Sequence, residues 1–112
     1  MEMIEAVIKP EKLEAVITAL ATLSILGATA FEVKGYGRQA GHTERFRGGR
    51  MDVGFVPKLM LRICVKDCET EPAIYKIRQA ARSGHVGDGK VFVRPVTRVV
   101  RIRTGDEDEK AL

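Results

Sequence analysis

The segment MIEAVIKPEKLEAVITALAT, residues 3–22, changes its hydrophobic period at Pro10. Before the proline, residues 3–8 are apolar apart from Glu5, which favours a strand. After it, apolar residues recur over residues 11–22 at the spacing of one helix face: Leu13, Val16, Ile17 and Leu20. Proline suits the first turn of a helix. The segment therefore predicts a strand followed by an amphipathic helix.

The same order recurs further along the chain. Residues 57–65 alternate in polarity as a strand does, and residues 70–82 have helical spacing, with Thr70 as N-cap and Gly84 as C-terminal cap. A half-buried strand is expected over residues 29–34, another over 91–96, and a short final strand over 98–103.

The resulting order, β-α-β-β-α-β, is that of the ferredoxin-like α+β fold, in which an antiparallel sheet carries both helices on one face. The other face would be bare, so we expect a homo-oligomer that covers it. The 112 residues fit one domain, and 45% hydrophobic with 30% charged residues is ordinary for a globular domain and speaks against disorder. The acidic tail, residues 106–109, is expected to be solvated.

Composition also indicates the kind of ligand and the cellular compartment to expect. The net charge of +4 suits binding of a small anion better than binding of a nucleic acid. No apolar run has membrane-spanning length and no signal peptide is evident, so we expect a cytoplasmic protein. Cys64 and Cys68 match no common metal or redox spacing and are expected to be reduced thiols.

Three segments combine glycine with basic residues: GYGRQAGHTE at 35–44, SGHVGDGK at 83–90 and RIRTG at 101–105. Glycines let backbone N–H groups approach an anion, and arginine or lysine neutralises its charge. The combination favours a polyphosphate ligand such as a nucleotide. On a strand, Arg101 and Arg103 would point the same way and together clamp phosphate oxygens. His42 and His85 lack partners for a metal site and are expected to be exposed loop residues.

Several stretches together resemble the PII nitrogen-regulatory signalling proteins: IKP at 8–10, EVKGYGRQ at 32–39, GHTE at 41–44, FVPK at 55–58, GDGKVFV at 87–93 and VVRIRTG at 99–105. The resemblance covers essentially the whole chain. It implies one PII-like domain over residues 1–112 and a homotrimer with ATP or ADP bound between subunits. Its loops would be a T-loop at about 37–55, a B-loop at about 82–90 and a C-loop at about 101–112.

The resemblance also implies roles for single residues. The nucleotide would be bound by Thr29, Gly35, Gly37, Arg38, Gln39, Cys64, Gly87, Asp88, Gly89, Lys90, Arg101 and Arg103. The effector 2-oxoglutarate would contact Gln39, Gly41 and Lys58, and Gln39 would place an oxygen on Mg²⁺ shared with both ligands. Such proteins are regulators rather than enzymes.

The T-loop would dock on a target protein, such as an ammonium transporter or a nitrogen-metabolism enzyme or regulator. Its basic residues Arg45, Arg47 and Arg50 would make that contact, which would be the chain's sole association with a membrane. Two departures from the family pattern stand out. Met51 replaces the tyrosine that many members have uridylylated, which predicts control by ligands alone. Arg62 replaces a common glutamate close to the nucleoside.

Two other readings of the same fold remain. A phosphoryl-transfer or acylphosphatase-like enzyme would need a nucleophile or a paired base, and only His42, His85 and Asp88 are candidates. An RNA-binding module of the same topology would need exposed aromatic residues on its central strands, and the sequence shows no such signature.

Overall fold

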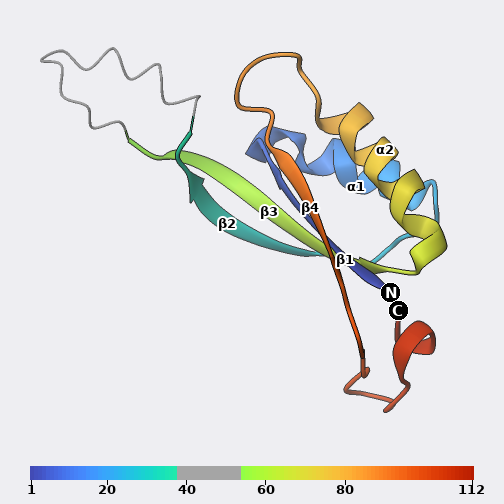
Figure 1. Ribbon diagram of the computed structural model, residues 1–112. Helices are drawn as coiled ribbons and strands as arrows, with labels where there is room; N and C mark the ends of the chain where they lie inside the picture. Colours follow the sequence, from blue (N-terminus) through green and yellow to red (C-terminus); the bar gives the residue numbers. More distant parts are fainter. Residues whose placement is uncertain (38–53) are drawn as a thin grey trace, which may run out of the picture.

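The computed structural model describes residues 1–37 and 54–112, and Figure 1 shows a sheet with its helices gathered on one side. In chain order the strands and helices are β1 (Glu2–Ile8), α1 (Leu13–Ala21), β2 (Thr29–Gly35), β3 (Val56–Val65), α2 (Thr70–Ala81) and β4 (Lys90–Pro95). The expected ferredoxin-like α+β order is confirmed. None of the helices in the described ranges is long and apolar enough to cross a membrane.

The four strands lie in the order β2-β3-β1-β4, and every neighbouring pair is antiparallel. The central strand β1 pairs with both β3 and β4, so its residues show which parts of these two strands lie at the same end of the sheet. Val7 lies opposite Met60 of β3 and Lys90 of β4, whereas Met3, near the start of β1, lies opposite Cys64 of β3. Since four residues of a strand span about 13 Å, Lys90 and Cys64 lie toward opposite ends of the sheet.

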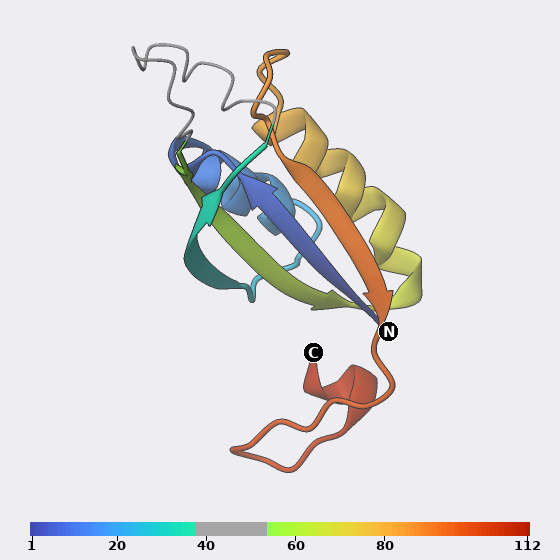
Figure 2. The same ribbon diagram turned by 60° about the vertical axis from the view of Figure 1, so that its left-hand side comes forward.

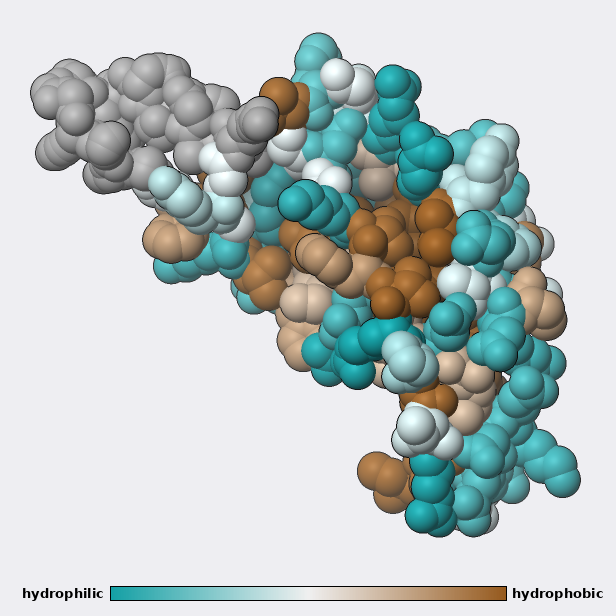
Figure 3. All heavy atoms as spheres, in the orientation of Figure 1, coloured by the Kyte–Doolittle hydropathy of each residue, from teal (hydrophilic) through white to brown (hydrophobic). Residues whose placement is uncertain are grey.

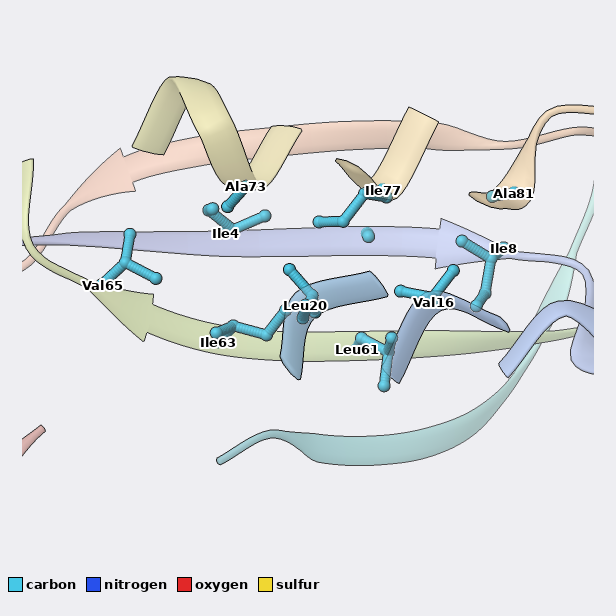
Figure 4. Packing of buried hydrophobic residues seen from close by; sticks show 11 residues of the cluster. Ile4, Ile8, Val16, Leu20, Leu61, Ile63, Val65, Ala73, Ile77 and Ala81 are labelled. Atoms are coloured by element: carbon cyan, nitrogen blue, oxygen red, sulfur yellow. The ribbon is translucent and has the colours of Figure 1, made fainter. Parts of the chain in front are cut away.

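The core lies between the sheet and its helices. Buried residues alternate along β1 and β3, as the two-residue period of a strand requires. Figure 4 shows the side chains of these strands facing those of α1 and α2. The buried hydrophobic cluster consists of Ile4, Ala6, Ile8, Val16, Leu20, Leu61, Ile63, Val65, Ala73, Ile77 and Ala81. In the described residues, no helix covers the opposite face of the sheet, which we call the open face (Figure 2).

The ends of the helices differ from the expectation. A 3-10 turn, Pro10–Lys12, precedes α1, so the α-helix begins at Leu13. Another 3-10 turn, Asp67–Glu69, precedes α2, which makes Thr70 the first helical residue and not the N-cap. Gly84 is not the C-terminal cap either, because the chain becomes extended at Arg82 directly after the helix.

The outer strands are less covered than expected. Residues 29–32 of β2 are all exposed, so the expectation of a half-buried strand is wrong for this part. The reason is that β2 is an edge strand, which pairs with β3 alone. On β4, Val93 is exposed as well, and Figure 3 shows hydrophobic side chains between β4 and α2.

The final strand expected over residues 98–103 is also wrong. A single bridge pairs Val100 with Glu107, and the intervening chain turns back on itself. Gly105 permits this reversal with a φ of +76°, and its N–H donates to the carbonyl of Arg101 over 2.8 Å. The acidic tail is therefore folded back, and Glu107, Asp108 and Glu109 are exposed, as expected for a solvated segment. It lies at the end of the sheet where the N-terminus also lies (Figure 2).

Candidate anion-binding site

A hollow of about 520 Å³ lies between the end of β2 and the loop that leads into β4. Gly35, Tyr36 and Gly37 line one side, Lys58 of β3 contributes to the floor, and residues 85–90 line the other side. The structure thus brings together two of the three glycine-rich basic segments. Of the expected ligand residues, it gathers Gly35, Gly37, Lys58, Gly87, Asp88, Gly89 and Lys90.

Lys58 supplies a buried cation in this hollow. Only 7% of the residue is exposed, and its Nζ donates a hydrogen bond to the carbonyl of Gly87. Burial lowers the pKa of the Lys58 ammonium, and the nearby charge of Lys9 lowers it further. Among the described residues, no carboxylate forms an ion pair with Lys58. The charges of Asp88 and Glu11 act in the opposite direction. A buried cation that forms no ion pair in the described chain is costly, so an anionic ligand would be favoured beside it.

The B-loop, which was expected at about residues 82–90 and lies between α2 and β4, depends on glycine. Gly84, Gly87 and Gly89 have φ values of +89°, +102° and +102°, which other residues rarely adopt. Gly89 is also pressed against β1, where an added Cβ would lie 1.7 Å from the carbonyl oxygen of Val7. These glycines therefore set the path of the backbone that lines the hollow.

The other expected ligand residues of the described chain lie elsewhere. Thr29 is opposite Arg62 on β3, and Cys64 is opposite Met3, toward the end of the sheet remote from Lys90. The segment that follows β4 and contains Arg101 and Arg103 lies at that same remote end (Figure 1). Arg101 forms an ion pair with Asp106 at 3.4 Å. One chain thus carries two groups of candidate residues that do not meet within it.

The remaining expected site residues lie outside the described residues: Arg38, Gln39, Gly41, Arg45, Arg47, Arg50 and Met51, together with His42. His85 is exposed and lines the hollow. The described residues contain no group of three or more His, Cys, Asp or Glu side chains that could hold a metal ion. Cys64 and Cys68 are both free thiols.

Comparison with known proteins supports the resemblance. The family model described as "Nitrogen regulatory protein P-II" matches residues 1–106. The chain belongs to the PII family. It is 50% identical to the nitrogen regulatory protein P-II of Azospirillum brasilense and 49% identical to P-II 1 of Escherichia coli K12, each over 112 residues and the full length of both chains.

A solved PII structure matches the fold as well. The structure described as Arabidopsis thaliana PII bound to citrate gives a TM-score of 0.83 at 36% identity, covering 99% of this chain and 91% of that one. PII proteins are signalling regulators, so this chain is a regulator of nitrogen metabolism and not an enzyme. The alternative of a phosphoryl-transfer enzyme is therefore not supported.

Arg62, the departure from the PII pattern in the described residues, has its own partners on the open face. Its guanidinium pairs with Glu5 at 3.0 Å and stacks over the ring of Phe31, 4.9 Å from the ring centroid. Arg94 of β4 pairs with the same carboxylate at 3.2 Å. Hydrogen bonds from Arg94 and Arg62 hold the pKa of Glu5 below its ordinary value. Glu5 thus offsets part of the charge that Arg62 introduces.

Sequence reasoning overlooked four residues in these networks. Lys9 and Ser83 contact Asp88 at the edge of the hollow, and Glu5 and Arg94 complete the cluster around Arg62. The motif IKP at 8–10 was a signal for Lys9, because it lies among the stretches that carry the family resemblance. Ser83 belongs to the segment SGHVGDGK at 83–90, but nothing local marked its side chain as a partner of Asp88. Nothing local marked Glu5 or Arg94 either, because their partners are remote in sequence.

Proposed function

We propose that this chain is a PII-type sensor that binds ATP or ADP together with 2-oxoglutarate and reports their binding through its T-loop. The observation that carries the proposal is the hollow itself. It combines a buried ammonium at Lys58, which has no carboxylate partner among the described residues, with a glycine-rich loop and Lys90. A buried cation suits a carboxylate, and loop amides beside a lysine suit phosphate.

For the nucleotide, the proposal uses both groups of residues. The backbone of Gly87 and Gly89 would donate to the phosphates, with Lys90 as a point charge beside them. Gly35 and Gly37 would let the chain pass close to the ribose and phosphates, and Arg38 would pair with the γ-phosphate. A neighbouring copy would supply the rest, namely Thr29 and Cys64 at the adenine and Arg101 and Arg103 at the phosphates.

For the effector, Lys58 would pair with a carboxylate of 2-oxoglutarate, and Gln39 and Gly41 would complete the contact. The description of the Arabidopsis relative as bound to citrate supports a carboxylate ligand in general. Mg²⁺ would neutralise phosphate and carboxylate charge when bound. Asp88 is the one acidic residue among the described residues that line the hollow, and both of its oxygens are engaged within the loop. The ion would therefore be held by ligand oxygens and Gln39.

A homotrimer would unite the two groups of residues and cover the open face. This face exposes Phe31 and Phe92 on its outer strands. Apolar surface that no helix covers in the described chain favours burial against further copies. In a cyclic assembly, the remote end of one copy would lie beside the B-loop of the next.

The output of the sensor would be the T-loop. Arg45, Arg47 and Arg50 would contact a target in the cytoplasm or the cytoplasmic mouth of a transporter such as an ammonium transporter. A pull-down with that transporter should be weakened by Arg47→Ala, and unchanged capture would argue against this role.

Because Met51 has no hydroxyl, incubation with a nucleotidylyltransferase should leave the mass of the chain unchanged.

Calorimetric titration tests the sensor directly. Purified protein is titrated with ATP, with ADP, and with Mg·ATP in the presence and absence of 2-oxoglutarate. Tighter binding of 2-oxoglutarate when Mg·ATP is present is the expected result. Lys58→Met should abolish the response to 2-oxoglutarate and leave ADP binding measurable. No heat with any of these ligands would refute the proposal and leave only the family and the fold.

A further inference from the structure

The carboxylate of Asp88 folds back onto the start of its own loop. Its Oδ2 accepts hydrogen bonds from the backbone N–H groups of Ser83, at 2.8 Å, and Gly84, at 2.9 Å. Its Oδ1 accepts from the hydroxyl of Ser83. Both oxygens of Asp88 are therefore engaged within the B-loop. The hydrogen bonds join Ser83 and Gly84 at the start of the loop to Asp88 near its end.

Lys9 anchors this arrangement to the body of the protein. Its Nζ lies 3.4 Å from Oδ1 of Asp88 and donates to the Ser83 hydroxyl over 3.2 Å. Lys9 directly follows β1, whereas Ser83 and Asp88 lie in the connection between α2 and β4. The three side chains thus tie the loop to the chain between β1 and α1, and the ammonium offsets the charge of the carboxylate.

The loop needs such a tie because its backbone is intrinsically loose. Gly84, Gly87 and Gly89 all have positive φ, and glycine loses more conformational freedom on ordering than any other residue. A loop ordered only when its ligand arrives would weaken binding by the cost of ordering. A carboxylate that accepts several hydrogen bonds can order the loop beforehand.

We propose that Asp88 is a positioning residue whose carboxylate, held by Ser83 and Lys9, shapes the B-loop for anion binding without itself contacting nucleotide or metal. This inference rests on the proposed function for the identity of the anion. The contacts that shape the loop do not depend on that function, because they form without a ligand. By the same argument, the side chains of Lys9 and Ser83 are positioning groups, because they hold the carboxylate of Asp88 in place. Engagement of both carboxylate oxygens also limits their repulsion of a phosphate in the adjacent hollow.

The pKa of Asp88 agrees with this geometry. The hydrogen bond from the Ser83 hydroxyl, followed by those from the backbone N–H groups of Ser83 and Gly84 and the contact with Lys9, holds this pKa well below its usual range, against the opposing effect of burial. The carboxylate therefore stays ionised, and the loop stays tied, at any pH at which the protein would work.

The test uses full-length protein with Asp88→Asn, Ser83→Ala and Ser83→Thr, and with Glu14→Gln as a control for loss of an exposed carboxylate. Amide chemical shifts and hydrogen exchange at Ser83 and Gly84 are measured by NMR without ligand. ATP and ADP affinities are then measured by calorimetry, with Mg²⁺ and again with a chelator. Thermal unfolding shows whether each variant is folded.

We expect Asp88→Asn and Ser83→Ala to shift both amides, to speed their exchange, and to weaken ATP and ADP by about tenfold. The loss should be the same with and without Mg²⁺, and Ser83→Thr should bind as wild type because it keeps the hydroxyl. A loss confined to Mg²⁺ conditions would make Asp88 a metal contact and overturn the inference, as would unchanged amides and affinities. Failure of the wild type to bind either nucleotide would instead refute the proposed function. The amide shifts and exchange rates measured without ligand would still show whether Asp88 holds the start of the loop.

Discussion

Gly89 has no room for a side chain, and this makes it the most demanding single residue of the B-loop. Its φ of +102° is strained for any other residue, and an added Cβ would meet the Val7 carbonyl oxygen at 1.7 Å. Strain of this kind costs about 1–3 kcal/mol before the clash is counted. We predict that Gly89→Ala lowers the free energy of unfolding by at least about 2 kcal/mol, measured by urea denaturation.

Gly27→Ala is the matched control for this substitution. An added Cβ at Gly27 would meet nothing within 4 Å, and its φ lies outside the strained range. Its unfolding free energy should therefore stay within about 0.5 kcal/mol of wild type. Equal effects of the two substitutions would show that the close approach of Gly89 to β1 does not constrain the loop.

Glu5 is the second residue with a sharp expectation. Its pKa is lowered on folding, chiefly by the hydrogen bond from Arg94. A lowered pKa stabilises the folded state above the unfolded pKa, and this contribution is lost as the pH falls through the folded pKa. We therefore predict that Glu5→Gln is less stable than wild type at pH 7 and that the gap closes in strong acid. Urea denaturation at a series of pH values from 7 downward checks this; a gap that does not depend on pH would contradict it.

At the scale of elements, the periodicity of apolar residues predicted the strands and helices. It did not predict how far each strand is buried or which side chains pair, because these depend on tertiary structure. The alternation along β1 and β3 and the helical spacing of Val16 and Leu20 each reflect burial against the single core. Alternation in residues 29–34 predicted a half-buried strand, but burial depends on position in the sheet, and β2 lies at its edge. For the site, glycine and basic residues marked the B-loop. The side chains of Lys9 and Ser83 were missed, because their partner is fixed only by the fold.

The C-terminal segment shows the same limit and yields a prediction. Arg101 has the alternation of a strand residue, yet it lies beside a turn and pairs with Asp106 at 3.4 Å. This carboxylate would compete with phosphate for the guanidinium under the proposed function. We expect Asp106→Asn to tighten ATP binding by less than about fivefold, since exposed ion pairs contribute about 0–1 kcal/mol. Arg101→Ala should weaken it, and calorimetry with both variants checks the two directions. Weaker binding by Asp106→Asn would mean that the pair instead holds Arg101 in place.

At the scale of the whole molecule, the placement of the candidate residues is the central feature. Lys90 lies at the B-loop end of the sheet, and the segment that contains Arg103 lies beyond the other end (Figure 1). Under the proposed function, a single chain would therefore offer two halves of a site that face different neighbours. If a cyclic oligomer joins the halves, every site takes Lys90 from one copy and Arg103 from the next. Defects in the two halves must then complement each other between chains.

We predict such complementation between Lys90→Ala and Arg103→Ala. Each variant alone should lose most of its ATP binding, because every site lacks one cation. Refolded together in equal amounts, the chains should recover about one quarter of the wild-type sites, since each half is intact with a probability of one half. Calorimetric stoichiometry measures this fraction. Refolding Lys90→Ala with the double variant is the control, and it should recover none because no chain supplies Lys90. If each site instead lay within one chain, mixing the two single variants would restore nothing, because each chain would keep its own defect.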